Sequence, residues 1–196
     1  MASNHIDNSK DIILGSGELY MDTFDGSTIP EDTAIEVDSK RAGNILGGAK
    51  LSYSIASQTV SSDNGRVKTT VLTEETVKFV TGMVTWIESW LKALIPTARL
   101  DGSAPQGRRR YKIGGLDHQH HERYLLRFVH QKKDGRKVRI TVTGPNTGEV
   151  GIAFDKEKPT TIDAEITAEP LDGEGTLVIF DEELATAPAA ATEGGE

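Results

Sequence analysis

The chain has 196 residues, of which 36% are hydrophobic and 27% are charged, and its formal net charge is −8. This length suits one domain with its own core, and the 20 glycines favour a turn-rich fold over coiled coils or collagen-like repeats. The sequence contains no cysteine, which excludes disulfides, thiolate metal sites and cysteine nucleophiles, and its acidic balance disfavours a general nucleic-acid binder.

The domain is expected to span residues 11–184, between a flexible N-terminus at 1–10 and a disordered, Ala-rich tail at 185–196. The first ten residues are polar, so we expect no secretory leader. The longest apolar stretch, residues 83–95, is interrupted by charged residues and is too short to span a bilayer. These features predict a soluble protein.

Short alternating segments predict strands in the first half of the chain. Ile35 and Val37 alternate with Glu36 and Asp38, as in a half-buried strand, and the same pattern recurs over residues 51–55. Each segment is therefore expected to place its apolar side chains on a core and its polar side chains in solvent.

A projecting arm is predicted over residues 58–70. This segment is polar around Asp63-Asn64-Gly65, which is typical of a hairpin turn, and its flanks hold few apolar residues. Residues 71–80 are expected to form the strand that returns from the arm to the body.

One amphipathic helix is predicted over residues 82–95. Its apolar face includes Trp86 and Trp90 and fills about half of the helical circumference, so the helix needs a sheet to cover. Pro96 is expected to end it.

A second hairpin is predicted around Asp134-Gly135, and its register follows from the side-chain pattern. A two-residue turn would mix charged and apolar side chains on both faces. A three-residue loop, with Gly135 in the left-handed region, instead pairs Phe128 with Ile140 and Leu126 with Val142 on one apolar face. The outer face and tip are then expected to carry Arg127, Lys132, Lys133, Arg136, Arg139 and Thr141.

The last strands complete a mainly β fold. Residues 161–169 alternate almost without fault, with an acidic ladder of Asp163, Glu165 and Glu169 on one face, and residues 176–180 form a closing strand. About nine short strands and one helix predict a β-sandwich or barrel with one flanking amphipathic α-helix and projecting loops.

Positive charge is concentrated between residues 99 and 139, where 12 Lys or Arg stand against four Asp or Glu, whereas the remainder has 10 against 26. The two regions should attract each other, within one fold or between copies. Arg108-Arg109-Arg110 beside Tyr111 is the best candidate for holding nucleic acid, but pairing with carboxylates of a neighbouring copy is favoured.

Four histidines, His118, His120, His121 and His130, lie close together in the sequence, and Glu122 adds a carboxylate. The first three lie in a polar loop that offers no supporting groups, so we expect no metal site and no cofactor. The chain also lacks the nucleophile-elbow, zincin, calcium-loop and dinucleotide-binding motifs, and we therefore do not expect an enzyme.

Several segments distributed over residues 11–184 share a resemblance: Ile13 to Tyr20, Gly47 to Tyr53, Lys112 to Leu116, Arg127 to His130, Phe154 to Lys158 and Thr161 to Glu165. They look like the corresponding parts of the tail tube (major tail) proteins of long-tailed bacteriophages. The resemblance implies a β-sandwich with a flanking helix that assembles into hexameric rings, and these rings stack into the hollow tube through which the genome passes.

The resemblance also implies the setting of the protein. It would be a virion protein of the phage tail, assembled in the host cytoplasm, with a tape measure protein and tail tip, baseplate and terminator proteins as partners. Double-stranded DNA would pass through the tube without sequence-specific binding, and no membrane is involved. A phage-derived injection particle is an alternative, because the same fold serves such machines.

Two sets of site residues follow as hypotheses. A wall of like charge keeps DNA off the lumen surface, and the candidates for this lining are Glu36, Asp38, Asp163, Glu165 and Glu169. Contacts between subunits or rings are assigned to two segments. The first is the projecting arm, with Ser61, Asp63, Asn64, Gly65 and Arg66. The second is the hairpin around Asp134-Gly135, which we call the basic hairpin, with Arg127, Lys132, Lys133, Arg136 and Arg139. The competing interpretation is that the acidic residues face solvent or pair with the basic hairpin.

The main alternative function is a monomeric β-sandwich module that binds carbohydrate or a receptor. Trp86 and Trp90 would then offer a stacking platform, although their helical spacing favours core packing. An enzyme without a local signature ranks last.

Overall fold

The computed structural model describes residues 17–61, 68–83, 88–152 and 162–184. The predicted flexible N-terminus, the arm tip with Asp63, Asn64, Gly65 and Arg66, Trp86 and the predicted tail at 185–196 lie outside the described residues.

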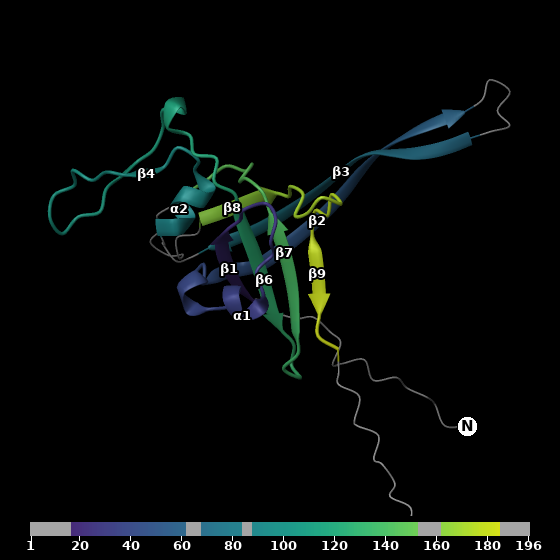
Figure 1. Ribbon diagram of the computed structural model, residues 1–196, viewed down its shortest axis with the longest axis horizontal. Coiled ribbons are helices and arrows are strands. Elements are labelled where there is room, and N and C mark those ends of the chain that lie inside the picture. The colour runs from purple at the N-terminus through teal and green to yellow at the C-terminus, as the bar shows by residue number, and fades with distance from the viewer. Residues whose placement is uncertain (1–16, 62–67, 84–87, 153–161, 185–196) are drawn as a thin grey trace, which may run out of the picture.

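The protein is mainly β and contains two antiparallel sheets that form a sandwich (Figure 1). The first sheet has the order β1-β6-β7-β9, with strands β1 (Glu18–Thr23), β6 (Tyr124–Gln131), β7 (Lys137–Thr143) and β9 (Ile179–Glu182). The second has the order β2-β3-β8, with strands β2 (Ile45–Ser61), β3 (Lys68–Met83) and β8 (Ile162–Thr167). The other elements are the pair β4 (Arg99–Leu100) and β5 (Tyr111–Lys112), the helices α1 (Asp32–Ile35) and α2 (Glu88–Leu94), and the 3₁₀ helices η1 (Asp38–Lys40) and η2 (Leu116–His118).

The main core lies between the two sheets and is flanked by α2. The first sheet contributes Leu126 and Phe128, the second contributes Phe79, and α2 adds Trp90 and Leu94. The aromatic rings of Phe79 and Phe128 lie 6.3 Å apart in a tilted arrangement, within the range that favours aromatic pairs. The predicted flanking helix therefore covers the sandwich edge through the residues that its amphipathic spacing indicated.

The β6–β7 register is the one that the sequence predicted. Phe128 pairs with Ile140 and Leu126 pairs with Val142, which places these apolar side chains on one face. Gly135 has φ = 89°, the left-handed conformation that the three-residue loop requires. Strand β8 is confirmed in the same way, because its residues alternate between buried and more exposed positions as the period of two demands.

A second, smaller core covers the other face of the first sheet. Tyr20 and Leu125 point to this side, where they meet Ile35 from α1 and Leu171 from the segment before β9. Strand β6 is consequently buried along almost its whole length, and not on one face only.

One predicted element was wrong, and one predicted boundary was too early. Residues 34–38 do not form a strand, since α1 ends at Ile35 and η1 begins at Asp38. The helical turn lets Ile35 enter the second core, and five alternating residues are too few to distinguish such a turn from a strand. The helix predicted over 82–95 begins later, because Met83 completes β3 opposite Ile162 of β8; the described helix is 88–94, and residues 84–87 are not described.

Candidate functional site

Strands β2 and β3 continue far beyond the sandwich as a two-stranded ribbon, which we define as residues 53–61 and 68–77 (Figure 1). Strand β8 pairs with β3 only from Lys78 to Met83, so β3 has no third strand beside it in the ribbon within the described residues. From Tyr53 to Ser61, eight steps of about 3.4 Å give the ribbon a length of roughly 27 Å. It is longer than the predicted arm, whose described parts form its outer end.

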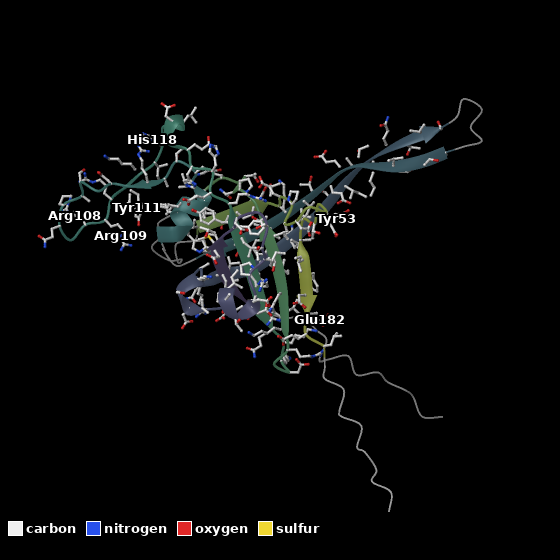
Figure 2. All side chains as sticks on the ribbon, in the orientation of Figure 1. Tyr53, Arg108, Arg109, Tyr111, His118 and Glu182 are labelled. Carbon is white, nitrogen blue, oxygen red and sulfur yellow. The ribbon has the colours of Figure 1, made fainter. Side chains whose placement is uncertain are left out.

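The ribbon exposes a set of large apolar side chains that the protein does not cover. Figure 2 shows Tyr53 at its base. The set is 52–59% exposed and consists of Tyr53, Ile55, Val60, Val71 and Leu72. An isolated two-stranded hairpin is only marginally stable in water, and unpaired strand edges with apolar side chains favour association with another chain. The ribbon is therefore the strongest candidate for an interaction surface.

Polar contacts between the two strands support the register of the ribbon but leave these apolar side chains exposed. The Tyr53 hydroxyl donates to Glu75 Oε1 at 3.1 Å, and the hydroxyls of Thr59 and Thr70 lie 3.0 Å apart across the strands. The hydrogen bond to Glu75 and the negative charge of that carboxylate raise the pKa of Tyr53, so this hydroxyl is neutral at physiological pH.

The acidic ladder of β8 faces outward, but it shares its face with lysines. Asp163 is exposed and forms no ion pair within the described part of the chain, whereas Glu165 accepts a hydrogen bond from Lys78 at 2.7 Å. Val80 pairs with both Glu165 and Lys50, so the side chain of Lys50 belongs to the same face. The local excess of negative charge is therefore smaller than the sequence of β8 alone indicates.

The other acidic candidates lie elsewhere. Glu169 pairs with Arg123 at 3.1 Å, and Asp38 is exposed on η1. Glu36 is not on an open wall, because its side chain is only 8% exposed and binds Arg139 at 2.5 Å and Lys137 at 2.7 Å. For Glu36 the competing interpretation, pairing with the basic hairpin, is correct.

The basic hairpin does not present its arginines to solvent, which corrects the predicted outer face. The segment around α1 covers this face, so Arg127 and Arg139 are both buried. Arg127 binds Asp32 at 2.6 Å, and Arg139 binds Glu183 at 2.8 Å in addition to Glu36. We call this set of ion pairs the charge network.

Charged side chains at the tip of the basic hairpin also form ion pairs within the same chain. Lys132 has a side chain that is only 1% exposed and pairs with Glu182, which Figure 2 shows at the foot of β9. Arg136 donates to Asp134 at 2.6 Å. Lys133 is exposed, so it remains the hairpin residue best placed to reach another molecule.

Glu36 and Arg139, at the centre of the charge network, stay ionised at neutral pH. Burial opposes ionisation of Glu36, but hydrogen bonds from Arg139 and Lys137 outweigh it and lower the pKa of this carboxyl. Burial likewise disfavours the charged Arg139, yet its bonds to Glu36 and Glu183 raise the pKa of the guanidinium. The network is thus a structural clamp between α1, the basic hairpin and the chain after β9.

The histidine-rich loop offers no visible metal centre. Within the described residues, no group of three or more His, Asp or Glu side chains is placed to hold a metal ion. His120 instead lies 3.1 Å from the Lys92 carbonyl oxygen through Nε2 and packs edge-on against Tyr124, while His118 is exposed on η2 (Figure 2). Burial and a hydrogen bond to Glu122 raise the pKa of the Tyr124 hydroxyl, which therefore stays protonated.

A tryptophan platform for sugars is not supported. Trp90 is 1% exposed in the main core, so its ring is unavailable for stacking, and Trp86 lies outside the described residues. Three cavities along the described surface have volumes of about 210–370 Å³, and the one of about 370 Å³ is lined by residues that include Glu18, Arg41 and Lys137.

Sequence reasoning missed two groups of residues. The anions Asp32, Glu182 and Glu183 were not assigned, although they neutralise the basic hairpin, and only an excess of acids in distant segments hinted at them. Tyr53 and Ile55 were placed in a half-buried strand, and the exposed apolar residues Val60, Val71 and Leu72 were not assigned to an interaction surface. The available signal was length, because two unbroken β patterns of 17 and 16 residues far exceed the usual five or six.

A comparison with protein-family models found no match, and a comparison with curated proteins also found none. Neither described helix combines the length and the apolar character that crossing a membrane requires.

Proposed function

We propose that this chain is a structural subunit that polymerises as stacked hexameric rings into the tail tube of a long-tailed bacteriophage. In that role it is a virion protein whose tube conducts the genome into the host. Its partners are further copies of itself, with the tape measure, tail tip, baseplate and terminator proteins at their respective positions, and DNA passes without sequence-specific contacts.

The observation that carries the proposal is the ribbon. It extends roughly 27 Å past the third strand of its sheet and leaves five large apolar side chains uncovered. Large apolar side chains left exposed along an unpaired stretch of strand favour association with another chain. A monomer gains nothing from such a projection, whereas a polymer can bury it against the next subunit.

One further feature supports this function. The sandwich with one flanking helix has the architecture that the resemblance implies.

Assembly is the direct test. Purified protein is concentrated stepwise and followed by light scattering and negative-stain electron microscopy, and we expect rings or tubes. The double variant Ile55→Lys with Leu72→Lys should stay monomeric and folded, because both side chains are exposed in the subunit. Leu184→Lys, at an exposed site beyond β9, is the matched control and should assemble. A wild-type protein that is monomeric at every concentration would refute the proposal.

The lining of the lumen needs a separate test. We expect the exposed Asp163 and its neighbour Glu165 to supply negative charge that keeps DNA off the wall. Particles with Asp163→Lys and Glu165→Lys should still form tubes but should eject DNA more slowly. Normal ejection kinetics would show that these carboxylates do not line the passage.

A further inference from the structure

A second projection leaves the body on the side opposite the ribbon (Figure 1). It runs from Arg99 to Ile113 through β4 and β5, and we call it the basic arm. The arm contains five cations and one anion, a net charge of +4. Because the whole chain has a net charge of −8, the rest of the subunit carries −12.

The basic arm is an ordered structure and not a loose loop. The Asp101 carboxylate accepts hydrogen bonds from the Ser103 hydroxyl at 2.7 Å and backbone amide at 3.1 Å, and it pairs with Lys112 at 3.2 Å and Arg110 at 3.4 Å. These bonds lower the pKa of Asp101, so the pairing persists at neutral pH. Asp101 is the arm's single anion, and it is already engaged by Arg110 and Lys112.

The far end of the arm carries exposed arginines, and exposed apolar side chains lie nearer its base. Figure 2 shows Arg108 and Arg109 at the far end, both exposed, and the Arg108 guanidinium has no ion pair within the described residues. Near the base, Leu100, Ile113 and Leu116 are exposed. A surface of this kind suits a partner that offers both carboxylates and apolar side chains.

We propose that the basic arm of one subunit binds the ribbon of a second copy, an inference that rests on the proposed function. The ribbon offers the complementary chemistry, because Glu74 and Glu75 are exposed on β3 close to Ile55 and Leu72. Its apolar side chains meet those of the arm, and its carboxylates meet Arg108 and Arg109.

The placement of the two surfaces allows the arm–ribbon contact to repeat from one subunit to the next. The arm and the ribbon extend in opposite directions along the longest axis of the molecule (Figure 1), so a subunit that uses one surface leaves the other free. Contacts between two different patches generate closed rings or open filaments, whereas a self-complementary patch stops at a dimer. The exposed charges mainly set register and rate of association, so the contact should weaken as salt screens them.

The test is a reciprocal charge exchange. One variant carries Arg108→Glu with Arg109→Glu, and the other carries Glu74→Lys with Glu75→Lys. Each alone should need a concentration at least about 10-fold higher to polymerise, the factor that corresponds to about 1.4 kcal/mol. Mixed in equal amounts they should polymerise at low concentration, because each acidic arm meets a basic ribbon and each basic arm meets an acidic ribbon.

The outcomes separate this inference from the proposed function. If the wild type polymerises and both variants do so equally well, the arm–ribbon contact is wrong while the tube proposal stands. The same conclusion follows if the mixture assembles no better than either variant. A variant arm that assembles normally but loses binding to a single-stranded oligonucleotide would make the arm a nucleic-acid surface instead. A wild type that never polymerises overturns both proposals.

Cysteine trapping gives a second readout that does not depend on the charge variants. The chain has no cysteine of its own, so the only thiols in the mixture are those of Ile113→Cys in one protein and Leu72→Cys in the other. Under mild oxidation of a mixture of the two proteins, we expect the disulfide-linked heterodimer to predominate. The control pair replaces Leu72→Cys with Glu174→Cys, an exposed site away from the ribbon. Equal crosslinking in both mixtures would contradict the proposed contact.

Discussion

Replacing Glu36 by Gln removes the central anion of the charge network. Its carboxylate binds Arg139 and Lys137, and the Glu36 and Arg139 side chains are 8% and 7% exposed. Removing one partner of a buried ion pair typically costs about 3–5 kcal/mol, because the remaining charge stays out of water. In a domain of this size, about 2–4 °C per kcal/mol gives a fall in Tm of roughly 6–20 °C.

The assay is thermal unfolding followed by circular dichroism at low protein concentration. Glu165→Gln is the matched control, since it removes an equally short ion pair at a position where both partners are a third or more exposed. A surface pair of this kind contributes at most about 1 kcal/mol, so the Tm of this control should change by no more than about 4 °C.

The experiment also decides between a clamp within the subunit and a contact between subunits. If Arg139 acts inside the subunit, Glu36→Gln lowers the Tm of the monomer and the loss persists at high salt, because buried pairs are poorly screened. A variant with unchanged Tm but impaired polymerisation would refute the clamp and return Arg139 to the interface. Arg139→Met combined with Glu36→Met should recover much of the lost stability, because it leaves neither of these two charges buried.

Three other expectations concern stability. The pKa values of Glu36 and Glu183 are lowered in the folded state. The stability that these carboxylates contribute is therefore fully present above their unfolded pKa, near 4.3, and is lost as the pH falls through their folded pKa. When both proteins are titrated with acid, the Tm of the wild type should fall more steeply than the Tm of Glu36→Gln. Gly144→Ala should strongly lower the free energy of unfolding measured in urea, since Gly144 has φ = 152° and an added Cβ would lie 2.0 Å from a backbone oxygen of β8. The control is Gly173→Ala, whose added Cβ meets open space, and it should change the free energy of unfolding by less than about 0.5 kcal/mol. Phe79→Ala should cost about 3–5 kcal/mol, because the ring is buried between the sheets; a cost below about 1 kcal/mol would contradict its place in the core.

Local alternation was enough to predict much of the first and second sheets. The β6–β7 register followed from keeping Leu126 and Phe128 on one face, and the face of β8 followed from the period of two between residues 162 and 167. These features depend on neighbours within one hairpin or one strand, and a slip of one residue would turn every apolar side chain outward.

The assignment of faces to solvent could not be made locally. Arg127 and Arg139 alternate with apolar residues as surface residues do, yet α1, about a hundred residues earlier in the chain, covers them and supplies their counter-charges. Conversely, Tyr53 and Ile55 alternate as core residues do, yet β8 ends before it reaches them. The sequence by itself determined which side chains share a face, because the strand period is a property of the backbone. Only the tertiary structure decided what lies over each face, because burial depends on segments that are distant along the chain.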